Sequence, residues 1–300
     1  MRPELLERLE RASLSKFSVP ERDIDWRPPF LDDLGAAIPE ETLSLYSLPI
    51  FDRMSSKERA HLARHEIAST FSISIRFEDA LIRTLARMVQ RSDPLEPEIP
   101  YLLHEVEEEA RHNRMFVRLI REIGVGSYPL DGWFGRFEYG LSSLVNRCPS
   151  LFLTSVLAVE DITDRLFATW LAWEGTHPVV RQVCRIHRME EARHIGFGEA
   201  YLSDRYPRAG AVERGLVRYL GPLTARLIFD LLVPPSVYVR AGVVPGPREA
   251  WRLWREACAS QHRSRFRREC VASLAGCLDR IGAIDRHSRR VWVASGLLAA

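Results

Sequence analysis

Cysteine is scarce in this chain, and the cysteines present do not form a recognisable framework. There are five, an odd number, with no Cys-x-x-Cys pair: Cys148, Cys184, Cys258, Cys270 and Cys277. This usage argues against a disulfide-stabilised secreted domain and is typical of buried or free thiols in a reducing compartment. The charged start Met1–Glu4 has no apolar stretch of the kind that signal peptides carry. We therefore expect a cytoplasmic protein.

Long apolar runs and a charge excess are also missing. The apolar stretch Leu151–Val159 is short and leads straight into Glu160, whereas a membrane-spanning helix needs about 18 or more apolar residues. The net charge is only +2, from 42 basic and 40 acidic residues, so nothing indicates nucleic-acid binding. We interpret the local arginine run at 263–268 as a solvated helix face. Because no flavin, nicotinamide or iron–sulfur motif appears, any electrons must come from an external donor.

The pattern of apolar residues, prolines and glycines predicts an all-α chain. With 300 residues and 46% hydrophobic content, it can bury the core of one extended domain. We expect residues 1–54 to form an N-terminal arm packed on a four-helix bundle of residues 55–205, and residues 206–300 to add C-terminal helices to the same domain. Predicted helices cover about 55–90, the segment before Gly124, and about 150–173, 178–203, 210–232 and 247–275, with a crossover at 124–149.

One five-residue pattern occurs twice. The segment Glu-Glu-Ala-Arg-His fills positions 108–112 and again 190–194, which are 82 positions apart. Each copy follows an acidic pair at the same distance, and the spacing is 31 residues in both cases: Glu78 to Glu109, and Glu160 to Glu191. A duplicated Glu…Glu-x-x-His pattern is what a four-helix bundle needs to hold two metal ions in its core.

The spacing has a physical reason. Residues three or four apart share a helix face, so Glu109 projects together with His112, and Glu191 with His194. His187 lies four residues before Glu191 and extends that stripe. Four carboxylates buried in one core need compensating positive charge, and two divalent cations supply it while neutral imidazoles complete the ligand shell.

Helical phase alone leaves some neighbours open as ligands. Glu190 also fits the stripe of the second copy, and Asp79 or Asp161 can replace the glutamate beside it. We favour the second glutamate of each pentapeptide because Glu-x-x-His is the spacing found in such bundles. Glu108 and Glu190 are then expected to point elsewhere and to pair with arginines.

These residues resemble the ferritin-like di-iron carboxylate superfamily, and the additional His187 resembles the p-aminobenzoate N-oxygenase family. The resemblance implies an all-α, ferritin-like four-helix bundle and a di-iron site with three histidines and four carboxylates. The implied ligands are Glu78, Glu109, His112, Glu160, His187, Glu191 and His194. In the first repeat the position of His187 is taken by Glu105, which we interpret as an acid that supports a ligand from behind or lies on the surface. Thr163, one turn after Glu160, is a hypothetical oxygen-pocket residue or a hydroxyl bonded to its own helix.

The resemblance implies an O2-activating non-haem di-iron oxygenase that oxidises an amine nitrogen, most often of an aryl amine, to hydroxylamine, nitroso or nitro. Two iron ions are expected, with Mn/Fe as the other possibility, together with O2 as co-substrate and an external reductase or ferredoxin. The amine is a small molecule or carrier-bound, and a homodimer is expected without nucleic-acid or membrane partners. The alternatives are a di-iron desaturase or C–H hydroxylase acting on an acyl or carrier-bound substrate, and a ferroxidase or iron-storage protein.

Overall fold

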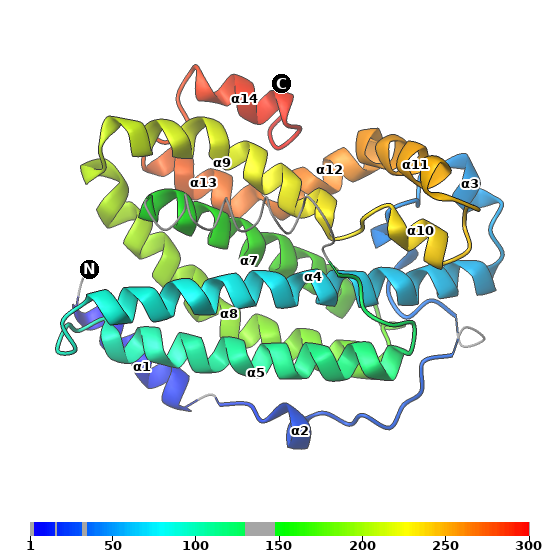
Figure 1. The fold of residues 1–300 in the computed structure, drawn as a ribbon, viewed down its shortest axis with the longest axis horizontal. Coiled ribbons are helices and arrows are strands. Elements are labelled where there is room, and N and C mark those ends of the chain that lie inside the picture. The colour runs from blue at the N-terminus through cyan, green and yellow to red at the C-terminus, as the bar shows by residue number, and fades with distance from the viewer. Residues whose placement is uncertain (1–2, 16, 32–34, 130–147, 300) are drawn as a thin grey trace.

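Four long helices form the centre of the molecule. The computed structural model describes residues 3–15, 17–31, 35–129 and 148–299. Two hairpin-like pairs make up the bundle: α4 (Ser56–Arg91) with α5 (Ile99–Ile123), and α7 (Pro149–Ala172) with α8 (Pro178–Arg205). Contacts of α5 with α8 and of α4 with α7 close the bundle, and Figure 1 shows α4 and α5 side by side along its length. The described residues contain no strand, so the predicted all-α, ferritin-like fold is confirmed.

Shorter helices surround this bundle. The N-terminal arm contributes α1 (Pro3–Ser15), α2 (Pro20–Asp23), a 3₁₀ turn η2 (Glu40–Thr42) and α3 (Pro49–Asp52). After α8 come η3 (Tyr206–Arg208), α9 (Ala211–Leu231), α10 (Ser236–Arg240), α11 (Pro247–Ala259), α12 (Gln261–Cys270), α13 (Ala272–Arg280) and α14 (Ser288–Ala294). Leu45 of the arm and Trp292 of the tail are fully buried and belong to the same hydrophobic cluster as the bundle helices. None of the described helices has the length and apolar character needed to cross a membrane.

The first bundle helix begins where its capping residues predict. The Ser55 backbone N–H donates to the Glu58 carboxylate at 2.7 Å, and the Glu58 N–H donates to Ser55 Oγ at 3.3 Å. This reciprocal pair satisfies donors that the first helical turn leaves free. At its far end α5 stops at Gly124, which adopts φ +78°, a left-handed conformation that costs glycine little. These two residues therefore mark the start of α4 and the end of α5.

Two expectations for the C-terminal part are wrong. The segment 247–275 is not one helix, because the Ser260 hydroxyl accepts the Arg263 N–H at 3.2 Å and starts a new helix there. The arginine run is not simply solvated either, since Arg263 and Arg267 are buried where α12 packs on α7. Arg267 reaches the Asp230 carboxylate at 3.2 Å. All five cysteines are free, as expected, whereas most of the expected crossover, residues 130–147, lies outside the described residues.

A buried carboxyl on α4 makes a pH prediction possible. Burial raises the pKa of Glu66 to about 7, against the opposing effects of hydrogen bonds from Ser44 and the charge of Arg263. The folded state therefore holds this proton more tightly than the unfolded chain does. Its stabilising effect is complete below the ordinary pKa near 4.5 and is lost as the pH rises through about 7.

The variant Glu66→Gln keeps an acceptor for Ser44 but cannot ionise. Between pH 5.5 and 8.5, we expect ionisation of Glu66 to lower the unfolding free energy of the metal-free wild type by about 2 kcal/mol, as the difference between its folded and unfolded pKa values requires. The unfolding free energy of the variant should not fall by this amount. Urea unfolding at the two pH values measures the difference. Parallel pH profiles for the two proteins would show that Glu66 is already ionised at pH 5.5.

Candidate metal centre

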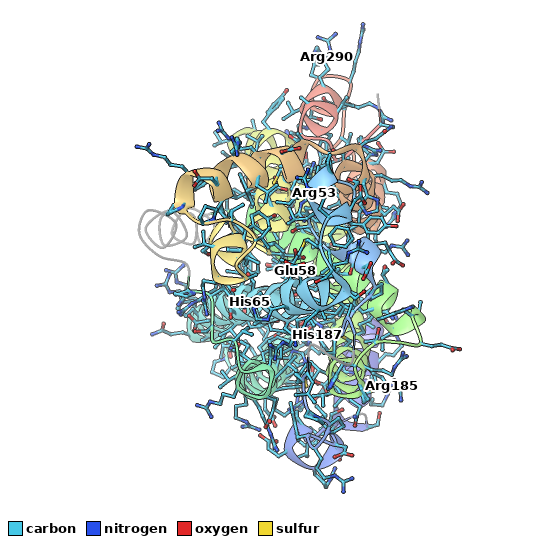
Figure 2. The ribbon with its side chains drawn as sticks, turned by 90° about the vertical axis from the view of Figure 1, so that its right-hand side faces the viewer. Arg53, Glu58, His65, Arg185, His187 and Arg290 are labelled. Atoms are coloured by element: carbon cyan, nitrogen blue, oxygen red, sulfur yellow. The ribbon has the colours of Figure 1, made fainter. Side chains whose placement is uncertain are left out.

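The seven predicted ligands come from all four bundle helices and are buried. Glu78 lies on α4 and Glu160 on α7, and each of the seven side chains belongs to a residue no more than 4% exposed. In the end-on view of Figure 2, His187 lies inside the bundle while Arg185, two residues earlier on α8, points outward. This is the result expected from a period of 3.6 residues per turn. The remaining ligands are Glu109 and His112 on α5, and Glu191 and His194 on α8.

Six of these residues form two overlapping groups with metal-binding geometry. One group contains Glu78, His112, His187 and Glu191, and the other Glu109, Glu191 and His194; within each, one ligand atom per residue lies within 4.8 Å of every other. Glu191 belongs to both groups and would therefore be a ligand common to both ions. The seventh residue, Glu160, is buried among Glu191, Glu78 and Glu109, and burial and these carboxylates together raise its pKa well above the ordinary value.

The histidine nitrogens show why cations fit this arrangement. His112 Nδ1 is 3.1 Å from a carboxylate oxygen of Glu109 and 3.1 Å from one of Glu191. His194 Nδ1 is 2.9 Å from Glu109 and 2.8 Å from Glu191. One ring nitrogen carries at most one proton and cannot serve two carboxylates with linear hydrogen bonds. These nitrogen and carboxylate oxygen atoms would instead hold a divalent cation, for which both are suitable ligands.

Several ligand atoms have no hydrogen-bond partner within the described chain. They are the carboxylate oxygens Glu78 Oε2, Glu109 Oε1, Glu160 Oε2 and Glu191 Oε1. Buried polar atoms are otherwise almost always paired, so these orphaned oxygens on ligand residues fit a metal site. The oxygen-and-imidazole donor set is one that iron and manganese accept.

The charges also match a cation site. Burial raises the pKa of Glu78, and the carboxylates of Glu109 and Glu191 raise it further. For Glu109 itself, burial opposes ionisation but the nearby histidines outweigh it and lower the pKa to about 2. Burial lowers the pKa of His187 to about 4, so this imidazole is neutral near pH 7, as a metal ligand must be. The raised pKa values of Glu78 and Glu160 thus indicate that the apolar surroundings alone do not stabilise every carboxylate of the site in its ionised form.

The first glutamate of each pentapeptide reaches across to the histidine of the other copy. Glu190 Oε2 is 2.9 Å from His112 Nε2, and Glu108 Oε2 is 2.9 Å from His194 Nε2. The expected arginine pairing is present as well: Arg193 donates to Glu108 at 2.7 Å, and Arg111 lies 3.6 Å from Glu190. His112 and His194 therefore turn Nδ1 toward the ligand cluster, and a carboxylate holds each of them at Nε2. Such an arrangement fixes the tautomer and ring orientation of ligating histidines.

An aromatic layer closes one side of the cluster. Phe116 and Phe167 each place their ring 5.3 Å from the His187 ring, and Phe71 stacks on Phe167 at 5.2 Å. All three phenylalanines are fully buried. The Thr163 hydroxyl is bonded to its own helix, since its Oγ1 donates to the Val159 carbonyl at 3.0 Å, and it is therefore not free to line an oxygen pocket. The cluster is therefore shielded from water on this side.

Sequence reasoning missed a buried tyrosine beside the site. Tyr101 is 1% exposed, and burial, together with Glu105, raises its pKa well above the ordinary value. Glu105 is itself buried, and burial raises its pKa to about 8 while the charge of His194 opposes the shift. The signal that was available is spacing: Tyr101, Glu105 and Glu109 recur every four residues along α5 and share one face.

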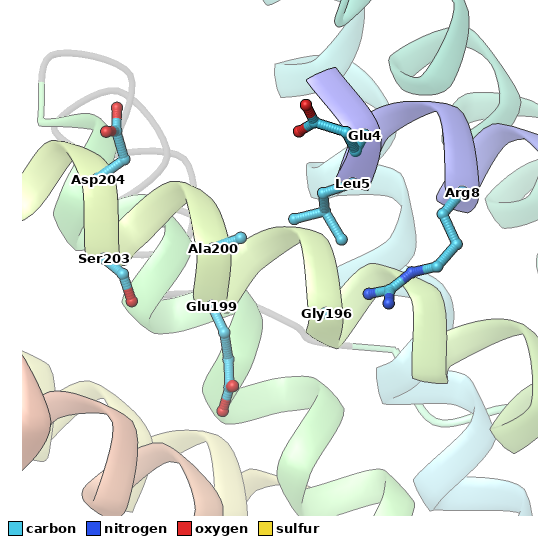
Figure 3. A pocket seen from close by; sticks show the side chains of 8 residues that line it. All are labelled: Glu4, Leu5, Arg8, Gly196, Glu199, Ala200, Ser203 and Asp204. Carbon is cyan, nitrogen blue, oxygen red and sulfur yellow. The ribbon is translucent and has the colours of Figure 1, made fainter. Parts of the chain in front are cut away.

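One groove on the described surface lies away from this cluster. It has a volume of about 680 Å³, runs between α1 and α8, and is lined by none of the seven ligands. Figure 3 shows Leu5 and Arg8 of α1 pointing toward the stretch of α8 that carries Gly196 and Ala200. The groove therefore does not open onto the predicted ligands, and the candidate metal centre is the buried cluster of carboxylates and histidines.

Four helices that present carboxylates and paired Glu-x-x-His segments to a common core define a ferritin-like di-metal carboxylate protein. A family model described as "P-aminobenzoate N-oxygenase AurF" matches residues 1–282. The chain belongs to this family. Family membership together with the buried cluster supports an oxygen-using oxidase with a di-metal centre.

Two uncharacterized mycobacterial proteins are similar in sequence: Rv0885 of Mycobacterium tuberculosis (strain ATCC 25618 / H37Rv) and Mb0909 of Mycobacterium bovis (strain ATCC BAA-935 / AF2122/97). Each is 29% identical over 240 residues, which cover 78% of this chain and 71% of the relative. Among solved structures, a variant R2-like ligand-binding oxidase with an anaerobically reconstituted Mn/Fe cofactor is 15% identical, with a TM-score of 0.46 and coverage of 94% of this chain and 93% of that one. An R2-like ligand-binding oxidase after photoconversion is 16% identical, with a TM-score of 0.42 and coverage of 98% of this chain and 90% of that one.

Proposed function

We propose that the protein is an O2-dependent di-iron N-oxygenase that oxidises an aryl amine to the hydroxylamine, nitroso or nitro level. The observation that supports this reaction most directly is the position of His187. Its Nε2 lies 3.5 Å from Glu78 and 3.4 Å from Glu191, and its ring centroid is 4.7 Å from that of His112. A third imidazole therefore faces the carboxylates that the two Glu-x-x-His segments supply. Membership of the p-aminobenzoate N-oxygenase family agrees with it.

The ligand residues and the phenylalanines beside them have different roles in this proposal. With metal bound, Glu78, Glu109, Glu160 and Glu191 would supply negative charge, and the imidazoles of His112, His187 and His194 would complete the set of ligands in their neutral form. Reduced iron bound there would supply the electrons that activate O2, with Mn/Fe as the other possible pair. Phe116 and Phe167 keep water away from His187, which protects a reactive centre from unproductive side reactions.

An external electron donor completes the proposal, because the sequence carries no flavin, nicotinamide or iron–sulfur motif. A reductase or ferredoxin is the proposed partner, a homodimer the proposed assembly, and the amine is a small molecule or a carrier-bound group. A di-iron desaturase or C–H hydroxylase is the alternative; it differs from the N-oxygenase in needing no third imidazole.

The test is a single-turnover assay. Iron-loaded protein is reduced chemically under anaerobic conditions, exposed to O2 and mixed with a panel of aryl amines that includes aminobenzoates, and products are identified by mass spectrometry. We expect hydroxylamine, nitroso or nitro products, with ¹⁸O from O2 incorporated at nitrogen. A metal-loaded, O2-consuming protein that leaves every amine unchanged but oxidises an acyl substrate would overturn the N-oxygenase proposal.

A further inference from the structure

The N-terminal arm touches the network that holds the metal ligands. The backbone N–H of Ser18 donates to Glu190 Oε1 at 3.3 Å in a buried hydrogen bond. The other oxygen of the same carboxylate is the one 2.9 Å from His112 Nε2. A residue 172 positions away in the sequence therefore shares one carboxylate with a predicted metal ligand.

The neighbouring residue of the arm secures the arginine of this network. The ring of Phe17 lies under the guanidinium of Arg111, which is 4.1 Å from the ring centroid. Arg111 is 5% exposed and lies 3.6 Å from Glu190, while its Nε and NH2 have no hydrogen-bond partner in the described chain. A cation over an aromatic face is attracted and held in place, so Phe17 restricts where Arg111 and its charge can lie.

The two metal positions differ in this respect. On the His194 side, Glu108 is held within the bundle itself by the Arg193 guanidinium at 2.7 Å. On the His112 side, the corresponding arginine lies farther away at 3.6 Å, and the arm supplies the missing donor through Ser18. The pentapeptides are identical, and two contacts distinguish the His112 side: Arg111 also donates to Glu107 at 3.2 Å, and the arm donates to Glu190 through Ser18.

Elsewhere the arm covers the bundle less completely. Between α1 and α8 it leaves the groove of Figure 3, about 680 Å³ in volume. Farther along, the contacts are more exposed: Arg114 pairs with Glu21 at 3.2 Å with both side chains at least half exposed. Leu9, Ile24 and Trp26 of the arm are also buried, so the buried contact at Ser18 is one of several attachments of the arm.

We propose that the arm residues Phe17 and Ser18 are positioning residues for one of the two metal ions, acting through Glu190 on His112. The proposal rests on the metal site of the proposed function but not on its substrate. Because coupling between two binding events is reciprocal, arm docking strengthens metal binding at the His112 position, and metal binding there tightens the docking of the arm.

The first experiment measures the arm. Hydrogen exchange of a peptide covering residues 17–24 is followed in metal-free protein and in protein saturated with Mn²⁺, without O2 or amine. We expect metal to slow exchange in the wild type severalfold. In Phe17→Ala, which removes the ring beneath Arg111, this metal dependence should be reduced. Leu14→Ala is the matched control, since Leu14 is on the same arm and 65% exposed, and it should behave as the wild type does.

The second experiment distinguishes the two positions. Anaerobic ⁵⁷Fe²⁺ titration with Mössbauer detection should show one of two iron sites weakened in Phe17→Ala and in Ser18→Pro, by about tenfold as for other residues that support a ligating histidine. Phe17→Tyr, which keeps an aromatic face, should restore it, and Glu108→Gln should weaken the other site instead. If metal leaves arm exchange unchanged in the wild type, or if Phe17→Ala weakens both sites equally, the arm is not a positioning element. Neither readout involves amine oxidation, so failure of the substrate assignment leaves this test intact.

Discussion

Replacing Glu191 with alanine is expected to abolish binding of both metal ions. Its carboxylate is the one shared by the two ligand groups, and its oxygens lie 3.1 Å from His112 Nδ1 and 2.8 Å from His194 Nδ1. Without this bridge each ion loses a charged ligand, and the two imidazoles lose the carboxylate that links them. Metal content should fall from about two ions per chain to nearly none, and activity should disappear with it.

Stability gives an independent readout of the same variant. Two ions bound at about a hundredfold excess over their dissociation constants stabilise the wild type by about 5 kcal/mol, which corresponds to roughly 10 °C in Tm for a chain of this size. We expect Glu191→Ala to lose this metal-dependent increase while the metal-free protein still unfolds cooperatively. Glu122→Ala on α5, which removes only a half-exposed helix pair with Arg118, should retain the full increase. A variant that still bound two ions would show that Glu191 is not a bridge.

The helix starts and the helix faces that carry the ligands could be predicted from the sequence, because capping residues and residue spacing determine them locally. The Ser55 and Glu58 capping box fixed the start of α4, and the three- and four-residue spacings placed Glu109, His112, Glu191 and His194 on inward faces. The prediction of one long helix over about 55–90 was correct because no turn signal interrupts this segment.

The parts that could not be predicted depend on tertiary contacts. No local pattern shows that Arg263 and Arg267 are buried, because this follows from α12 packing on α7. Likewise, Glu108 and Glu190 were expected to pair with arginines, but their reach to the opposite histidines requires both copies to face each other across the bundle. The contact of Ser18 with Glu190 spans most of the chain and has no sequence signature at all.

Replacing His187 with alanine is expected to weaken one metal position and to lower activity by about 100-fold or more, as loss of a direct ligand exceeds the 10–100-fold typical of supporting residues. Burial lowers the pKa of His187 to about 4, so the change removes a neutral donor and leaves the charge balance of the site intact. Glu78 and Glu191 then face a cavity in place of a ring nitrogen. Metal content is expected to fall toward one tightly bound ion per chain, measured by anaerobic Fe²⁺ titration.

Added imidazole separates a lost ligand from a damaged fold. The cavity lies between Phe116 and Phe167, which packed against the original ring, so free imidazole should enter it and restore part of the metal binding and activity. Arg185→Ala is the control on the same helix, two residues earlier and pointing outward (Figure 2), and should match the wild type. If His187→Ala retained both ions and full activity, the centre would need only six ligands. That outcome would favour the desaturase or hydroxylase alternative, because the third imidazole is the feature on which nitrogen oxidation was inferred.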